Sequence, residues 1–557
     1  MPAATLSNGR LSARFGSNPL AIRSLKNLCT GAEFCAHGTH SLIVRTPGKI
    51  SDPAFLNRVD SASREGGALL LCLVDASAKY RAELRIAEDS DGLRFDATVT
   101  APEPVWMAEW KVSGLDLTNI IIPALGGQSL GAGMPAGTTL TYKYPFWWNA
   151  QFVIGAMKGG GCWLRTKETD PRFKLVRIKK GAAGFDLSYG FEADAPLTAT
   201  TLSATWYLDC YRGTWNVPVE THRSWLEPAF GLHPLARHPH FPPWASEIDF
   251  VLELWGIGKD RPEPLHTFAD MERRLRSWAR LHVPERTLLY LPGFAEHGID
   301  SRAPSYAPSE ELGGKAGFQR LVETAHRRGY RVMVHTNAIC MTFEHPQFER
   351  FRDHQVVDAF GRLQGWGLDI DGDWLSEPYF AYINPGVREW GDLMEGVIGD
   401  LIRTYGVDAV FLDQTLLAFN VSRGPNFVSG MREFVRGMQE AFPTTLFAGE
   451  GIHEQVLAAL PMAQIHGIDS IAEVHGMEGR ARWRQAHPVS SHLFSPYTRL
   501  TAHLLTRHPS HPMFELQESA YKALGVIPAL CLYNALQPMD TPGTRRMIRR
   551  AAPLRRK

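Results

Sequence analysis

Two carboxyl side chains stand at the ends of apolar segments, at a spacing that could support acid–base chemistry. In VDAVFLDQ (407–414) the apolar run ends at Asp413, and Glu450 lies near the end of TLFAGEG (445–451), 37 residues later. Runs of this kind indicate buried strands. A helix expected over 427–441 between them would make the two strands parallel neighbours. Both carboxyl groups would then face one pocket.

Such a pair supplies the two groups that cleavage of a glycosidic bond requires. One carboxylate stays ionised as nucleophile or base, and the other donates a proton to the leaving oxygen. Gly449 and Gly451 on either side of Glu450 would let a sugar approach the backbone closely. Either acidic residue alone could cap a helix or pair with an arginine, but the two together favour catalysis.

Alternating strands and helices are expected to position this pair. From Glu247 onward, apolar runs alternate with helical stretches, and Gly329 and Gly406 stand where helix C-caps would need them. The expected strands are 248–255, 286–293, 331–339, 407–414, 445–451, 463–468, 469–476 and 526–534, with helices over 317–328, 387–405 and 427–441. The pattern predicts a (β/α)8 TIM-type barrel over 246–540. A doubly wound open sheet is the alternative, disfavoured because no glycine-rich phosphate turn follows a strand.

An antiparallel β-sandwich is expected over 1–210, before the barrel. Short segments rich in β-branched and aromatic residues follow one another there, at 69–76, 80–88, 93–101, 151–157, 161–167 and 199–209. The proline-rich stretch 211–245, with a helix-like piece over 219–225, is predicted to be a linker. The arginine-rich stretch 541–557 is predicted to be a solvated basic tail.

Motifs for cofactors and metals are missing from the sequence. The glycine-rich patch 126–133 has no strand–turn–helix setting, and no G-x-S-x-G elbow stands at a strand end. The acidic cluster 369–373 slightly resembles a calcium loop, but Trp374 stands where glycine is required. The seven cysteines form no CxxC pair. The histidine-rich segment 487–512 fits no usual metal-site spacing and is predicted to be loop and helix surface. No cofactor and no metal are therefore expected.

Other polar and aromatic side chains are expected to line the same pocket. Sugars offer hydroxyls to carboxylates, amides and imidazoles, and C–H faces to indoles. For each candidate a packing or capping role is an equal alternative. These candidates lie at or beyond strand ends or in the loops between: Trp255, Glu296, His297, His335, Asn337, Trp366, Gln414, Glu473 and His475.

Trp147 and Trp148 lie in the segment YPFWWN (144–149), just before the expected strand 151–157. Adjacent residues of an extended chain point to opposite sides, so one face of a sandwich cannot bury both indoles. One interpretation is that they pack between the two domains. The other is that at least one indole stacks on a sugar at the barrel mouth, so both are candidate substrate-binding residues.

Charge and hydropathy exclude several classes of partner. The chain has 59 basic and 58 acidic residues, a balance that gives no reason to expect nucleic acid. No stretch offers the roughly 18 uncharged apolar residues of a membrane helix. The first residues lack the apolar core of a signal peptide, which predicts a cytoplasmic protein. Nothing in the sequence indicates an oligomeric state.

The two carboxylate segments and an earlier block resemble a known group of enzymes. GVDAVFLDQT, FAGEG, and YPFWWNAQFVIGAMKGGGCWLRTKETD are similar to segments of retaining glycosidases of the endo-α-N-acetylgalactosaminidase type. The likeness extends to uncharacterised sandwich-plus-barrel proteins with a domain of unknown function, over about residues 120–475. The resemblance implies Asp413 as nucleophile and Glu450 as acid/base. It does not imply a mucin-type substrate, because the substrate-binding loops differ and no further β-domains follow the barrel. A small imported or intracellular glycoside is expected instead.

A glycoside hydrolase, with a carbohydrate or glycoside as its partner, is therefore the predicted function. A sugar isomerase or lyase on the same barrel is one alternative, weakened by the lack of a metal-ligand set. A non-catalytic carbohydrate-binding protein is the other. The sugar, its anomeric configuration and its linkage are not predicted.

Overall fold

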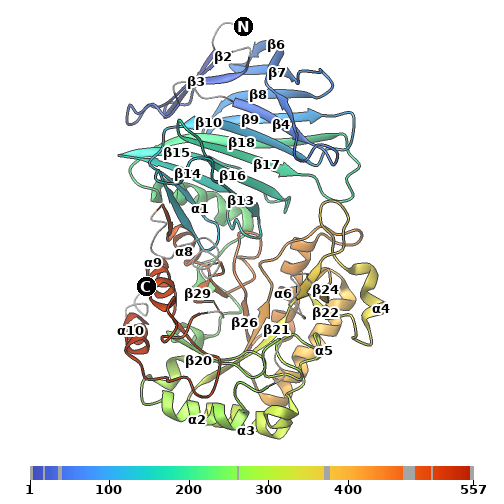
Figure 1. Cartoon of the computed structure of the whole chain (residues 1–557), viewed down its shortest axis with the longest axis vertical. Helices are drawn as coiled ribbons and strands as arrows, with labels where there is room; N and C mark the ends of the chain where they lie inside the picture. The colour runs from blue at the N-terminus through green and yellow to red at the C-terminus, as the bar shows by residue number, and fades with distance from the viewer. Residues whose placement is uncertain are drawn as a thin grey trace. The chain divides into compact units, whose positions relative to one another are not determined.

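The computed structural model describes residues 4–16, 19–35, 40–259, 263–368, 377–467, 483–503 and 506–551. The chain forms two compact units. The first is made of Met1–Ala229, Ala359–Gly361 and Ala481–Leu493. The second is made of Phe230–Asp358, Arg362–Arg480 and Phe494–Lys557. In Figure 1 the blue-to-teal strands belong to the first unit, and most of the green-to-red elements belong to the second.

The first unit is an antiparallel β structure, as predicted. A six-stranded sheet has the order β13-β16-β17-β10-β4-β5, a ten-stranded sheet the order β28-β12-β11-β14-β15-β18-β9-β8-β7-β6, and a small sheet the order β1-β2-β3. The bounds are β1 (Ala4–Ser7), β2 (Leu11–Gly16), β3 (Ala21–Asn27), β4 (His40–Arg45), β5 (Ala54–Leu56), β6 (Arg58–Glu65), β7 (Ala68–Val74), β8 (Arg81–Asp89), β9 (Gly92–Thr100), β10 (Met107–Leu115), β11 (Asn119–Ile122), β12 (Gln128–Gly131), β13 (Thr139–Tyr144), β14 (Phe152–Met157), β15 (Gly160–Arg165), β16 (Lys174–Lys180), β17 (Phe185–Glu192), β18 (Thr201–Arg212) and β28 (Arg484–Ala486).

Alternating burial explains why these segments form a sandwich. In β9, Leu93, Phe95, Ala97 and Val99 are buried while residues between them are more exposed. Such two-residue periodicity places one face of each strand in the core. The ring of Phe95 lies 4.3 Å from that of Trp110, centroid to centroid, in this core.

Two segments differ from the predicted domain bounds. Helix α1 (Asn216–Phe230) occupies much of the predicted linker, because Val219, His222 and Leu226 form one buried helical face. Strand β28, expected to be part of the barrel, instead pairs with β12 of the first unit. Main-chain pairing with a sheet edge is specified by contacts distant in sequence, which periodicity alone does not reveal.

The second unit contains the predicted barrel. Its eight strands are parallel and follow one another in chain order, with neighbours β29-β27-β26-β25-β21-β20-β19-β30. They are β19 (Phe250–Leu254), β20 (Thr287–Leu291), β21 (Arg331–Asn337), β25 (Ala409–Asp413), β26 (Leu446–Gly449), β27 (Met462–Gln464), β29 (Arg499–Thr501) and β30 (Ala529–Leu532). A parallel bridge between Thr501 and Ile527 joins the two ends of this order, next to β29 and β30. The sheet is thereby brought to near closure.

Helices alternate with the barrel strands. Their bounds are α2 (Phe268–Trp278), α3 (Gly314–Arg327), α4 (Phe348–Phe351), α5 (Arg388–Tyr405), α6 (Phe427–Ala441), α9 (Phe514–Leu524) and α10 (Pro542–Ala551). Helix α8 (Val489–Phe494) belongs to the first unit except for its last residue. A small antiparallel sheet of β22 (Cys340–Thr342), β24 (Glu377–Tyr382) and β23 (Gly365–Leu368) is inserted after β21. Gly406 ends α5 with a left-handed φ of 69°, and its N–H donates to Ile402, which confirms the predicted cap.

The segment predicted to be a basic tail, 541–557, instead contains helix α10. Met547 and Ala551 are fully buried along one side, and Arg550 pairs with Glu518 of α9. The arginines occupy the other positions of an amphipathic helix. Because they are so numerous in the sequence, the apolar residues between them were not recognised as a buried helix face.

In the part of the chain that the structure describes, no helix combines the length and the apolar character needed to cross a membrane.

Candidate active site

Strand pairing brings Asp413 and Glu450 together. Asp413 is the last residue of β25, and Glu450 directly follows β26, at the C-terminal ends of neighbouring parallel strands. The N–H of Glu450 donates to the carbonyl of Leu412, one residue before Asp413, over 3.1 Å. Both acidic residues are 8% exposed. The two carboxyl groups thus occupy the end of the barrel where enzymes of this architecture place their chemistry.

Asp413 has one oxygen held in place and one left without a partner. Its Oδ2 accepts a hydrogen bond from Asn337 Nδ2 over 3.1 Å. Among the described residues no group donates to its buried Oδ1. An unpartnered buried carboxyl oxygen is costly unless a ligand uses it. This oxygen can therefore meet a substrate.

Asp300, which the sequence analysis did not single out, is the centre of a neighbouring network. Asn337 bridges the two aspartates, because its Nδ2 also donates to Asp300 Oδ2 over 3.2 Å. Asp300 has a left-handed φ of 58°, which costs a residue other than glycine on the order of 1–3 kcal/mol. Its other partners are Tyr306 OH and His335 Nε2, both at 3.1 Å, and Lys259 Nζ at 3.7 Å. The network fixes Asp300 beside Asp413.

His335 is held on both ring nitrogens inside the barrel. Its Nδ1 lies 2.7 Å from the hydroxyl of Tyr290, and its Nε2 faces Asp300. Burial alone would raise the pKa of Asp300, but His335, Lys259 and Asn337 together lower it below its usual range. Asp300 is therefore an anion in the free protein.

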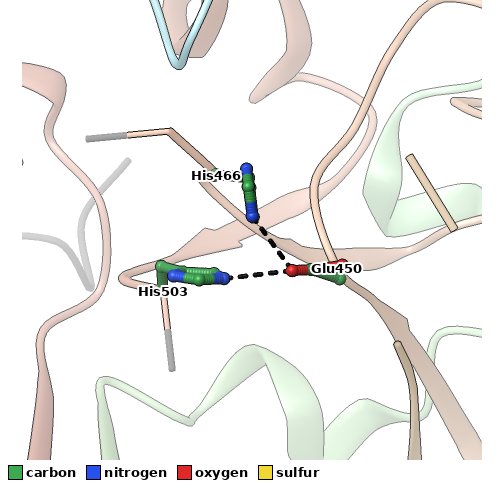
Figure 2. A group of neighbouring side chains, drawn as sticks. All are labelled: Glu450, His466 and His503. Carbon is green, nitrogen blue, oxygen red and sulfur yellow. Dashed lines mark hydrogen bonds and ion pairs between the residues drawn. The ribbon is translucent and has the colours of Figure 1, made fainter. Parts of the chain in front are cut away.

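Glu450 has a different environment, formed by two histidines (Figure 2). His466 Nε2 lies 3.0 Å and His503 Nε2 lies 3.2 Å from the same oxygen, Oε1. The other oxygen, Oε2, accepts the backbone N–H of Gln414 over 2.9 Å. The two imidazole rings meet edge to face, with centroids 4.4 Å apart. Every oxygen of Glu450 thus has a donor.

These environments give the two carboxyl groups opposite shifts in pKa. Burial and the negative charges of Glu450 and Asp300 raise the pKa of Asp413 well above its usual range, against a smaller effect of Lys259. Burial alone would also raise the pKa of Glu450, but His466 and His503 hold it well below its usual range. In the free protein the pair therefore retains one proton, on Asp413.

Gln414 orients Glu450 through its backbone. Its φ of 63° is left-handed, and this conformation directs its N–H to Glu450 Oε2. Its side chain is also held, because Nε2 donates to the hydroxyl of Tyr382 over 3.0 Å and Oε1 lies 3.2 Å from Cys340 Sγ. Burial raises the pKa of the Cys340 thiol well above its usual range, so this thiol stays neutral.

Trp366 is connected to the network by Lys259. The residue lies on β23, is 40% exposed, and has Lys259 Nζ 5.0 Å from its ring centroid. The same ammonium group faces Asp300. An exposed indole beside fixed charges can offer an apolar face to a ligand.

Comparison with solved structures gives the fold a known parallel. The alpha-N-acetylgalactosaminidase NagBb from Bifidobacterium bifidum, in complex with Gal-NHAc-DNJ, is 15% identical, with a TM-score of 0.76 over 99% of this chain and 93% of that one. Its GalNAc complex gives 15% identity and a TM-score of 0.75, with the same coverage. This chain has the fold of a glycosidase.

A family model and a weaker structural match complete the comparison. Residues 201–470 match the model of a domain of unknown function (DUF6259). The GH36 alpha-galactosidase AgaA from Geobacillus stearothermophilus is 10% identical, with a TM-score of 0.48 over 99% of this chain and 86% of that one. No curated protein matches the sequence. The resemblance expected from the sequence, to a sandwich-plus-barrel group related to glycosidases, is confirmed for the fold.

Within this fold, the described candidates that remain in the second unit, Trp255, Glu296 and His297, make none of the hydrogen bonds described above for Asp413 and Glu450. Trp255 follows β19, is 7% exposed and packs against Tyr533, with ring centroids 5.2 Å apart. Glu296 is half-buried in the loop after β20, and its backbone N–H donates to Ala307. His297 is exposed beside it. Glu473 and His475 lie outside the described residues.

Trp147 and Trp148 belong to the first unit. Trp148 is fully buried, donates its indole N–H to the carbonyl of Phe152 over 3.1 Å, and packs edge to face against Tyr189. It is a core residue of the sandwich, so its ring has no face for a sugar. Trp147 is half-buried and stacks on Phe146, with centroids 4.4 Å apart.

Three important site residues were absent from the sequence candidates. His466 lies inside the weak strand expected over 463–468, whereas β27 ends earlier, at Gln464, so the expected strand end missed it. His503 follows β29, which has only three residues and lies in the segment predicted to be loop and helix surface. Asp300 lies nine residues beyond β20, in an irregular loop. Position after a strand gave no signal in these last two cases.

Proposed function

We propose that this protein is a glycoside hydrolase that uses Asp413 and Glu450 as its catalytic carboxyl groups. The observation that carries the proposal is the placement of two buried carboxyl groups at the C-terminal ends of adjacent barrel strands. Glycosidic cleavage needs such a pair, with one group charged and one protonated. The fold shared with an alpha-N-acetylgalactosaminidase supports the same reaction class.

Asp413 is proposed to be the nucleophile. Asn337 fixes one of its oxygens and leaves Oδ1 available to attack the anomeric carbon. The glycosidic C–O bond breaks as the bond to Asp413 forms, and water later displaces the carboxylate. Retention fits carboxyl groups about 5–5.5 Å apart, whereas inversion needs about 6.5–9.5 Å for an intervening water. The resemblance of both carboxylate segments to retaining glycosidases supports retention.

Glu450 is proposed to be the acid/base. It would protonate the leaving oxygen in the first step and take a proton from water in the second. Because the proton of the free protein resides on Asp413, it must pass to Glu450 when a glycoside binds. Positive charge developing at the anomeric carbon favours an ionised Asp413 and so drives this transfer. The imidazoles of His466 and His503 can exchange protons with Glu450.

A reversed assignment, with Glu450 as nucleophile and Asp413 as acid, is the second candidate. The pKa directions of the free protein favour it, because they leave Glu450 ionised and Asp413 protonated. The donors to both oxygens of Glu450 oppose it, since a carboxylate with every oxygen hydrogen-bonded is a poor nucleophile. Identification of the residue that carries a trapped sugar separates the two assignments.

Terminal α-linked N-acetylgalactosamine is the first substrate class to test, in small glycosides. This choice follows the activity of the structural relative. Trp366 is proposed to offer its exposed face to the sugar ring, with Lys259 and Asp300 as polar neighbours. Sugar sites combine such an apolar face with a few fixed polar groups.

A screen of 4-nitrophenyl glycosides, read by released phenol, tests the proposal. We expect turnover of at least one α-glycoside by the wild type and its loss in Asp413→Asn, with His240→Ala as a matched variant outside the site. Incorporation of oxygen from labelled water into the free sugar identifies hydrolysis and excludes an isomerase or lyase. Binding of glycosides that persist unchanged would instead identify a carbohydrate-binding protein and refute the proposal.

A further inference from the structure

Glu450, His466 and His503 form a compact group of metal-ligating side chains (Figure 2). One oxygen and two imidazole nitrogens lie within 4.8 Å of one another. The histidines follow the consecutive barrel strands β27 and β29, and Glu450 follows β26. Three neighbouring strands therefore direct their ligands to one point at the end of the barrel.

The two distances from Glu450 to the histidines are close to those between ligands of a tetrahedral metal centre. Zn²⁺ binds imidazole nitrogen and carboxylate oxygen at about 2.0–2.2 Å, so two ligands at a tetrahedral angle lie about 3.3 Å apart. The separations from Glu450 Oε1 are 3.0 Å to His466 Nε2 and 3.2 Å to His503 Nε2. A cation could enter with small shifts of the side chains.

Surrounding contacts already orient the ligands. Gln414 N–H holds Glu450 Oε2, so the carboxylate presents only Oε1 to the histidines. The N–H of His503 donates to the hydroxyl of Tyr521, and the His503 carbonyl accepts from Thr506. Partners of this kind fix ligand orientation and strengthen metal sites.

Charge and access also favour a cation. The carboxylate of Asp300, which Asn337 bridges to Asp413, adds a negative charge at the same end of the barrel. The side chain of His466 is 15% exposed, which leaves a route from solvent. Two imidazoles with one carboxylate suit Zn²⁺ better than Ca²⁺ or Mg²⁺, which prefer oxygen ligands.

We propose that Glu450, His466 and His503 bind Zn²⁺, and that the bound ion blocks the acid/base function of Glu450. Each imidazole gives its Nε2 lone pair to the ion and releases the Nε2 proton to solvent or carries it on Nδ1. Glu450 Oε1 becomes a ligand and can no longer carry a proton to the leaving oxygen. The blocking effect rests on the proposed glycosidase function, whereas metal binding does not.

Binding is tested on the full chain after removal of metals with a chelator. ZnCl2 binding is measured by calorimetry, and CoCl2 is added to record the visible absorption of tetrahedral cobalt. We expect one bound equivalent in the wild type and its loss in His466→Gln/His503→Gln. Glutamine keeps a hydrogen-bond donor for Glu450, so the double variant should still fold. Melting curves that match those of the wild type would confirm this. His238→Ala/His240→Ala removes another pair of neighbouring histidines, with ring centroids 6.2 Å apart, and should retain the site.

Activity provides the second measurement. Zn²⁺ should inhibit hydrolysis in the wild type and in the control pair, and a chelator should restore the rate. If His466→Gln/His503→Gln still binds a full equivalent of Zn²⁺, or if the wild type binds no Zn²⁺, the proposed metal site is wrong. If Zn²⁺ binds at the site but hydrolysis is unchanged or faster, the proposed block of the acid/base function of Glu450 is wrong. If no glycoside is hydrolysed, the glycosidase proposal fails while the binding result still decides the site.

Discussion

At the scale of residues, equivalent positions carry different chemistry. Asp413 and Glu450 both stand at the end of a barrel strand, with the same exposure. Asp413 has one amide donor and negative neighbours, whereas Glu450 has two imidazoles and a backbone N–H. The pKa values of the two groups therefore move in opposite directions. Which of the two groups acts as the acid therefore depends on how a bound sugar changes the order of their pKa values.

Substitution of Glu450 should affect poor leaving groups most. An activated phenol needs little protonation, whereas an alkyl alcohol depends on the acid. We expect Glu450→Ala to slow an alkyl glycoside by about 10²–10⁴-fold and a dinitrophenyl glycoside far less. Azide should restore the rate on the activated substrate, because this anion attacks the anomeric carbon of the covalent intermediate in place of water and needs no general base. Equal losses on both substrates without azide rescue would show that Glu450 is not the acid.

At the scale of elements, β19 carries a carboxyl group with no ion partner among the described residues. Glu253 is fully buried and pairs in register with Tyr290 and Cys531 on the neighbouring strands. Cys531 and Trp255 lie beside its carboxyl group and offset only part of the effect of burial. Burial raises its pKa to about 8. The folded protein therefore holds a proton that the unfolded chain releases above about pH 4.5.

This proton makes the stability of the barrel depend on pH. Since the folded-state pKa is raised, the stabilising effect is complete below the unfolded pKa and is lost as the pH rises towards 8. The free energy of unfolding should fall by about 1.4 kcal/mol per pH unit in this window. Glu253→Gln removes that dependence. The difference in melting temperature between Glu253→Gln and the wild type should rise steadily from pH 5 to pH 7.5. A difference that stays constant over this range would contradict the raised pKa of Glu253.

Helix α10 offers a second test at this scale. A solvated tail would tolerate any substitution, but Met547 is fully buried. We expect Met547→Ala to cost about 2–5 kcal/mol and to lower the melting temperature of the protein. Arg545→Ala, on the exposed side, is the matched control and should change it little. Similar melting curves for both variants would mean that α10 does not pack on the barrel.

Sequence periodicity predicted the long elements and missed the short ones. Strands such as 407–414 and 445–451 contain continuous apolar runs, and Gly406 needs a left-handed φ, so both features can be read without a structure. Strand β29 has three residues, too few for a periodic signal. Strand β28 is defined by its partner β12, which precedes it by more than 350 residues.

At the scale of the whole molecule, some residues of the site could be predicted from the sequence and others could not. The two carboxyl residues were predictable, because the barrel places strand ends at one mouth. The histidines that hold Glu450 come from β27 and β29, and Asp300 comes from a loop after β20. Their approach depends on closure of the entire barrel. Sequence reasoning therefore found the candidate catalytic pair, while the groups that set its protonation required the fold.

The most direct test of the account is to trap the sugar on the enzyme. A 5-fluoro glycosyl fluoride of the sugar identified by the screen slows release of a covalent intermediate, and peptide mass spectrometry then locates the label. We predict one added fluorosugar, as an ester on Asp413. Asp413→Asn should carry none. A label on Glu450 would contradict the assigned roles, and the absence of any label, with inversion of the first-formed sugar by NMR, would contradict the retaining mechanism.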